Sequence, residues 1–142
     1  MPNILVDTGI WLALCDSKDT SLERDEIEDL FDRIGSHTII LPWPVLFETL
    51  RTKFVKNRNA LGRFEQEIKS SKIKIFDDAR YRESALDHSI RSSKAGRHLS
   101  MVDCLLRLMI EDPSIKIKYL ATLNVRDFSD VCRTRNVEIW PT

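Results

Sequence analysis

The chain has 142 residues, of which 42% are apolar and 31% charged, and its 22 basic residues balance 22 acidic ones. This composition predicts a single globular domain over residues 1–142, with a core large enough to fold without disulfides or a structural metal. No apolar stretch approaches the ~20 residues of a membrane span, and the first residues do not resemble a secretory signal. We therefore expect a cytoplasmic protein with no membrane partner. The formal net charge of zero does not favour a uniformly basic surface for nucleic acid.

Apolar runs alternate with amphipathic stretches through the first half of the chain. In order, they predict a strand over 3–7, a helix over 10–14, a helix from a Thr20–Glu23 capping box to Gly35, a strand over 38–41, a helix from Pro44 to Val55, and a helix from an Asn59 cap to Ser70. In the first strand the apolar run Ile4-Leu5-Val6 ends at Asp7, which is typical of a strand buried on both faces.

The same alternation continues through the second half. In order, it predicts a strand over 73–76, a helix from Asp77 to Ser93, a loop over 94–98, a helix over 100–111, a strand over 118–122, a helix over 126–132 and a strand over 137–140. Strands that alternate with helices predict an α/β fold, a three-layer α/β/α sandwich with a mostly parallel central sheet. In such sheets ligands bind outside the carboxyl ends of the strands.

The cysteines and two of the tryptophans are expected to be structural. Cys15, Cys104 and Cys132 are widely separated and match no metal-ligand spacing, so they are expected to be ordinary thiols in a reducing compartment. Trp11 and Trp43 are expected to pack in the core, with stacking on nucleic-acid bases as the alternative.

Four acids are candidates for chemistry at the carboxyl edge of the sheet. Asp7 ends the first strand, Asp127 follows the strand over 118–122, and Glu48 and Asp103 lie within predicted helices. Each has a structural alternative, because Asp7 and Asp103 also suit helix starts and Glu48 suits a solvated helix face. No single one of them identifies a site.

Taken as a set, the four acids predict catalysis with a bound metal ion. Clustered carboxylates repel one another unless a cation neutralises them, and Mg²⁺ or Mn²⁺ prefers oxygen ligands. A divalent ion held in this way activates water and offsets charge on a phosphodiester. We assign Asp7 and Asp103 as the residues that anchor the metal, with Glu48 and Asp127 completing the catalytic site.

The order and local sequence of these motifs resemble the PIN-domain ribonucleases, and among them the VapC-type toxins of toxin–antitoxin pairs. The matching segments are Ile4-Leu5-Val6-Asp7-Thr8-Gly9-Ile10-Trp11-Leu12, Val45-Leu46-Phe47-Glu48-Thr49-Leu50, Leu99-Ser100-Met101-Val102-Asp103, Thr122-Leu123-Asn124-Val125-Arg126-Asp127-Phe128 and the closing Val137-Glu138-Ile139-Trp140. The resemblance covers the whole chain.

The resemblance implies a PIN-like fold and a Mg²⁺- or Mn²⁺-dependent endoribonuclease that cleaves RNA. Members are often homodimers, and many are held inactive by a co-expressed antitoxin, so both partners are expected here. Asn124 stands where many members carry an acid. Asp127 then serves as the fourth carboxylate, and the number of metal ions stays open.

Substrate binding is assigned to residues beside the acids. Thr8, Ser100, Thr122 and Asn124 adjoin them in sequence, and Lys94 and Arg97 flank Gly96 in the loop before Asp103. Cations near the acids are expected to contact RNA phosphates, since such contacts dominate nucleic-acid affinity. The alternative for both cations is a solvated surface position.

An aspartic protease and a module without catalysis are alternative interpretations of the chain. The Asp7-Thr8-Gly9 triplet matches the aspartic-protease signature, but those enzymes are all-β and need a second such triplet, so we reject it. A PIN-like module without catalysis, which binds RNA or protein, is the main competitor, and Asn124 and the zero net charge keep it open.

Overall fold

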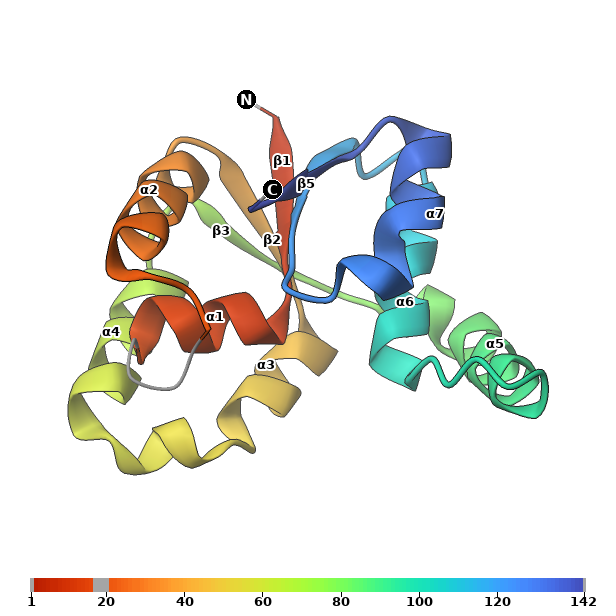
Figure 1. Ribbon diagram of the computed structural model, residues 1–142, viewed down its shortest axis with the longest axis horizontal. Helices are drawn as coiled ribbons and strands as arrows, with labels where there is room; N and C mark the ends of the chain where they lie inside the picture. Colours follow the sequence, from red (N-terminus) through yellow and green to blue (C-terminus); the bar gives the residue numbers. More distant parts are fainter. Residues whose placement is uncertain (1, 17–20, 142) are drawn as a thin grey trace.

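A computed structural model describes residues 2–16 and 21–141 (Figure 1). Its centre is a five-stranded sheet in the order β3-β2-β1-β4-β5, in which every neighbouring pair is parallel. The strands are β1 (Asn3–Val6), β2 (Thr38–Pro42), β3 (Ile73–Phe76), β4 (Ile117–Ala121) and β5 (Glu138–Trp140).

Helices cover both faces of this sheet. They are α1 (Thr8–Cys15), α2 (Arg24–Gly35), α3 (Trp43–Leu50), α4 (Arg58–Ile68), α5 (Arg82–Lys94), α6 (Met101–Glu111) and α7 (Val125–Arg135), with 3-10 turns at Lys53–Lys56 and Ala79–Tyr81. Figure 1 shows α1 to α4 on one side of the strands and α5 to α7 on the other. The predicted three-layer α/β/α sandwich is therefore confirmed, and its sheet is parallel throughout the described residues.

The chain winds outward from β1 in both directions. It first adds β2 and β3 on one side of β1, with α1 to α4 as connections, and then returns to add β4 and β5 on the other side, with α5 to α7. Right-handed crossovers place the two sets of helices on opposite faces. The winding direction reverses between β1 and β4, and the crevice at the carboxyl ends of these two strands is where open parallel sheets bind ligands.

The core forms where the central strand meets the helices. Ile4, Leu5 and Val6 of β1 are completely buried, as the apolar run predicts, and each such side chain contributes roughly 1.5–3 kcal/mol on burial. On one face Trp11 of α1 packs edge-on against Phe64 of α4, with ring centroids 5.3 Å apart. All three cysteines are buried and free, in agreement with a structural role.

Several helix ends differ from the predictions. Asn57 and not Asn59 caps α4, because Asn57 Oδ1 accepts hydrogen bonds from the amides of Asn59 and Ala60 at 3.1 and 3.2 Å. The predicted Thr20 cap lies outside the described residues, and α2 begins at Arg24 with a capping box formed by Glu23 and Glu26.

The helix predicted from Pro44 to Val55 is shorter than expected. It ends at Leu50, and a separate 3-10 turn follows. The hydroxyls of Thr49 and Thr52 donate to the carbonyls of Val45 and Thr49, at 2.7 and 2.8 Å. Such local side-chain bonds compete with the helical backbone pattern and favour its ending here.

The helix after β3 begins later in the chain than predicted. The helix predicted from Asp77 begins only at Arg82, because Asp77 and Asp78 start a 3-10 turn first. Lys94 ends that helix and so does not lie in the predicted loop.

No helix in residues 2–16 and 21–141 combines the length and the apolar character that crossing a membrane requires.

Candidate active site

Asp7 directly follows β1, at the carboxyl edge of the sheet next to β4. Its amide continues the strand pairing by donating to the carbonyl of Ala121 at 2.9 Å. Its Oδ1 accepts from the amide of Thr8 at 2.8 Å, and its Oδ2 accepts from the hydroxyl of Thr122 at 2.9 Å. Asp7 caps α1, which is the structural role expected for it as an alternative from the sequence. The bond from Thr122 also connects the carboxylate to the end of β4.

The environment of Asp7 disfavours its charged form. Burial is the largest effect and raises the pKa of this carboxyl, the hydrogen bonds from Thr122 and the Thr8 amide lower it, and the nearby charge of Glu48 raises it again. The net pKa lies above the ordinary value. A buried carboxylate next to another acid is a group that a cation would stabilise.

Glu48 is held beside Asp7 by Thr8. The Thr8 hydroxyl donates to Glu48 Oε1 at 2.5 Å, across the contact between α1 and α3. Thr8 itself is buried, so this bond fixes a half-buried glutamate near the start of α1. Glu48 is therefore not on a fully solvated helix face, because it is half-buried and bound to Thr8.

Asp103 lies in the first turn of α6, which Ser100 caps by accepting from the Asp103 amide at 3.0 Å. The pKa of Asp103 is raised to about 6, mainly by burial and then by the negative charge of Asp7. The hydrogen bond with Ser100 lowers this pKa, and the charges of Asp127 and Glu48 raise it further. Acids from four separate segments therefore act on one another at this edge of the sheet. Burial is the largest cause of the raised pKa of Asp103, and the charges of the other three acids add to it.

Asp127 is connected to the same crevice through Asn124. The Asn124 side-chain amide donates to Asp127 Oδ2 at 2.7 Å, and the Asn124 backbone amide donates to the Thr122 hydroxyl at 3.0 Å. Thr122 thus links the carboxylate of Asp7 to the turn that carries Asp127. An acid at position 124 would have no proton to donate to Asp127 when ionised.

The acids share one electrostatic field without forming a compact group. Within the described parts of the chain, no three or more His, Cys, Asp or Glu side chains are arranged so that they could hold a metal ion. The donor chemistry nevertheless fits Mg²⁺, which binds through one or two carboxylates and keeps several waters. Asp7 and Asp103, whose pKa values are both raised, are the donors that a cation would relieve most.

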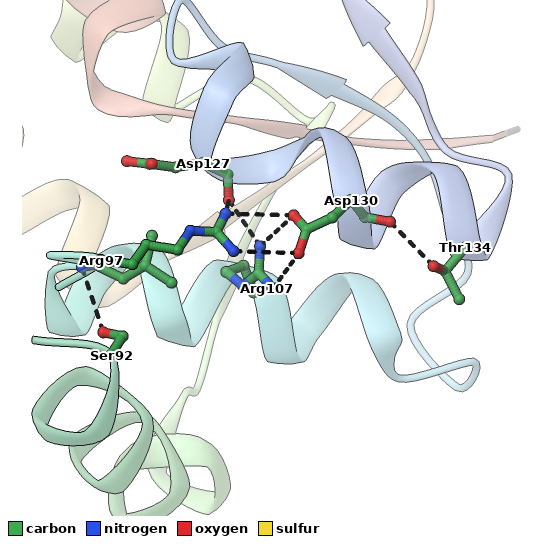
Figure 2. Close-up of polar contacts among 7 residues, drawn as sticks. Ser92, Arg97, Arg107, Asp127, Asp130 and Thr134 are labelled. Carbon is green, nitrogen blue, oxygen red and sulfur yellow. Dashed lines mark hydrogen bonds and ion pairs between the residues drawn. The ribbon is translucent and has the colours of Figure 1, made fainter. Parts of the chain in front are cut away.

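The two predicted phosphate contacts lie in different surroundings. Lys94 is exposed at the end of α5, and its side chain makes no hydrogen bond or ion pair with other described residues. Arg97 is also exposed, but its guanidinium donates to Asp130 at 3.4 and 3.5 Å and to the Asp127 carbonyl at 3.4 Å (Figure 2). Arg97 therefore reaches the acid-bearing turn, whereas no contact links Lys94 to it.

Sequence reasoning missed Arg107 and Asp130. Arg107 of α6 donates to the Asp127 carbonyl at 2.8 Å and forms a two-fold ion pair with Asp130 of α7 at 2.7 and 2.8 Å. The available signal was spacing: Arg107 is one helical turn after Asp103, and Asp130 is one turn after Asp127. This spacing indicates a contact between Arg107 and Asp130 only when the packing of α6 against α7 is known.

Trp43 differs in position from the prediction. It was predicted to lie in the core, but its side chain is 42% exposed on α3 and contacts the ring of Phe47, which is 63% exposed. Trp11 is buried as predicted. The prediction for Trp43 was wrong because α3 carries apolar residues on all sides, and only one side can face the sheet.

Comparison of the chain with protein-family models and with curated proteins gave no match in either case. The α/β fold and the acids at its crevice therefore define the candidate site on their own evidence.

Proposed function

We propose that this protein is a metal-dependent endoribonuclease that hydrolyses phosphodiester bonds in RNA with Mg²⁺ or Mn²⁺. One observation carries the proposal. Burial raises the pKa of Asp103 at the carboxyl edge of a doubly wound sheet, and the negative charges of Asp7, Asp127 and Glu48, which come from three other segments, raise it further. A cluster of acids that disfavours its own ionisation is suited to a divalent cation, and this cation chemistry is suited to phosphodiesters.

The residues of the chain have separable tasks in this proposal. Asp7 and Asp103 would hold the cation. Thr122 and the Thr8 amide occupy one direction on each oxygen of Asp7, which fixes the orientation of its carboxylate. Thr8 orients Glu48, and Asn124 orients Asp127. When bound, the cation would offset charge that develops on the phosphodiester and make water a better nucleophile.

The proposal extends to substrate and partners. Acids repel an RNA backbone, so cations next to them must supply the attraction, and Lys94 and Arg97 remain the assigned phosphate contacts. The resemblance to VapC-type toxins supports a toxin of a toxin–antitoxin pair that acts as a homodimer and is inhibited by an antitoxin protein. An antitoxin-like reading frame directly beside the gene is the observation that would support this extension.

The direct test is cleavage of end-labelled single-stranded and structured RNA. We expect cleavage in Mg²⁺ or Mn²⁺, no cleavage in EDTA, and loss of turnover in Asp7→Asn and Asp103→Asn, which remove a charge and little volume. The variant Asp87→Asn, on exposed α5, is the matched control and should cleave like the wild type. Full cleavage in chelator, or wild-type rates in both site variants, would contradict the proposal.

A binding module without catalysis is the second candidate. It is favoured by the lack of a compact metal-holding group among the described residues and by the amide of Asn124, which already occupies an oxygen of Asp127. This candidate predicts RNA or protein binding that is unaffected by chelator and no cleavage under any metal condition. The cleavage assay and a binding assay on the same preparation therefore separate the two functions.

A further inference from the structure

Two arginines contact α7 next to Asp127: Arg107 of α6, and Arg97 of the loop that precedes α6. Arg107 of α6 donates to the Asp127 carbonyl and to both oxygens of Asp130, and Arg97 adds longer bonds to the same two acceptors. Figure 2 shows both guanidinium groups pointing toward Asp130, while the carboxylate of Asp127 extends away from it. The contact thus engages the backbone of Asp127 and leaves its side chain to the site.

Arg107 is the stronger of the two partners. Its bonds to Asp130 are 2.7 and 2.8 Å long, against 3.4 and 3.5 Å for Arg97, and its side chain is 17% exposed, against 43%. The hydrogen bonds from Arg107, and then those from Arg97, hold the pKa of Asp130 well below its usual range. The planar fork of an arginine matches a carboxylate in one orientation, so the pair defines geometry as well as charge.

Arg107 of α6 binds α7 at two points. One is the carboxylate of Asp130, and the other is the backbone carbonyl of Asp127 in the first turn of α7. Asp103 lies one turn before Arg107 on α6, and Asp127 lies one turn before Asp130 on α7. The bonds from Arg107 to Asp130 and to the Asp127 carbonyl therefore determine how Asp103 and Asp127, in the first turns of the two helices, lie relative to each other.

We propose that Arg107 and Asp130 are positioning residues that hold Asp127 in register with Asp103. The inference rests on the proposed function, because the register matters to cation binding and hydrolysis. Neither residue is expected to touch RNA or metal. Residues that orient acids from behind a metal site typically change affinity or activity by about 10- to 100-fold when they are replaced.

The test compares Arg107→Gln with Arg80→Gln in the full chain. Arg80 forms an ion pair with Asp112, the residue that follows α6, at 2.8 Å, and its hydrogen bonds go to Tyr81, Asp112 and Ser114 and to none of the four acids, so its variant reports the general effect of losing an ion pair. We expect Arg107→Gln to lower kcat by about 10- to 100-fold with little change in KM, and to raise the Kd for Mn²⁺ measured by calorimetry. Arg80→Gln should change neither quantity.

A charge exchange separates positioning from stability. Arg107→Glu combined with Asp130→Arg restores an ion pair between α6 and α7, but it leaves no α6 donor at position 107 for the Asp127 carbonyl. We expect the exchange to recover only part of the Tm, because the new arginine would face Arg97, and not to recover kcat. Asp130→Asn, which keeps the Arg107 bond to that carbonyl, should lose less activity than Arg107→Gln and serves as the folded variant if Arg107→Gln does not fold.

The results distinguish this inference from the proposed function. A wild-type protein that cleaves no RNA contradicts the function itself. If the wild type cleaves, then an unchanged kcat or an unchanged Mn²⁺ affinity in Arg107→Gln overturns the positioning role, and so does a charge exchange that recovers kcat together with Tm. An Asp130→Asn variant with wild-type kcat and Mn²⁺ affinity would also overturn it.

Discussion

The hydroxyl of Thr122 donates to Oδ2 of Asp7 at 2.9 Å, so the residue that follows β4 holds the acid that follows β1. The two residues are 115 positions apart in the chain and both are buried. The bond crosses the point where the winding of the sheet reverses, and Thr122 also accepts from the Asn124 amide there. A single hydroxyl therefore connects two of the candidate catalytic segments.

Replacement of this hydroxyl by a methyl group should destabilise the protein. Thr122→Val keeps the shape of the side chain but leaves a buried oxygen of Asp7 and the Asn124 amide without a partner, which costs about 1–3 kcal/mol. Urea unfolding measures the loss, and Thr122→Ser should recover most of it. The control is Thr134→Val, because the Thr134 hydroxyl donates to the Asp130 carbonyl at an exposed site. Equal losses in both valine variants would contradict a special role for Thr122.

The pKa of Asp103 predicts an unusual pH dependence of stability. In the folded protein this pKa is about 6, against an ordinary value of 3.8. The folded state therefore holds the proton more tightly, so the contribution of Asp103 to stability falls as pH rises from about 4 to 6. Asp103→Asn cannot ionise, and without divalent ions it should be more stable than the wild type at pH 7 by on the order of 2–3 kcal/mol.

The gap between Asp103→Asn and the wild type should close below about pH 4, and chemical denaturation in EDTA across this range measures it. Asp112 provides a control of opposite sign. Bonds from Tyr81 and Ser114 lower the pKa of Asp112 to about 2, so its contribution is present above about pH 4 and is lost as pH falls toward 2. Asp112→Asn should therefore destabilise the protein at pH 7. A variant Asp103→Asn that is less stable than the wild type at pH 7 would contradict the raised pKa.

Divalent ions should stabilise the folded protein. Binding to Asp7 and Asp103 relieves both burial and mutual repulsion, and an ion at ten times its Kd adds about 1.4 kcal/mol to the free energy of unfolding. Thermal melts with millimolar Mg²⁺ or Mn²⁺ should show a higher Tm than melts in EDTA. The increase should disappear in Asp103→Asn. A Tm that does not respond to either ion in the wild type would contradict a metal site.

The strands and the acids could be predicted for the same physical reason. A central parallel strand is buried on both faces, so its apolar run is visible in the sequence, and the first polar residue after it marks the carboxyl edge. Asp7 is the first polar residue after the buried apolar run of β1, and it lies at the carboxyl edge of the sheet. Helix ends were less predictable, because Asn57 and Asn59 are equally suited to capping by type, and only the backbone geometry selects Asn57.

The contacts behind the acids could not be predicted from sequence. Arg107 and Asp130 are 23 positions apart on two helices, and nothing in either helix alone indicates that they face each other. Arg97 was predicted to bind phosphate, and that role stays a prediction, but its bonds to Asp130 show that a surface cation next to a site can also serve the fold. Composition and spacing identify such residues only as charged.

Lys94 gives the clearest test of the RNA path, because Arg97→Ala would also remove the bonds from Arg97 to Asp127 and Asp130 of α7. If Lys94 contacts a phosphate, Lys94→Ala should weaken binding of all RNA sequences alike and reduce the slope of log affinity against log salt by about 0.7. The Asp103→Asn variant in Ca²⁺ allows binding to be measured without cleavage. Lys74→Ala is the control, since Lys74 is exposed on the edge strand β3, away from the acids. Equal effects of the two lysine variants, or no effect of either, would show that RNA follows another face of the protein.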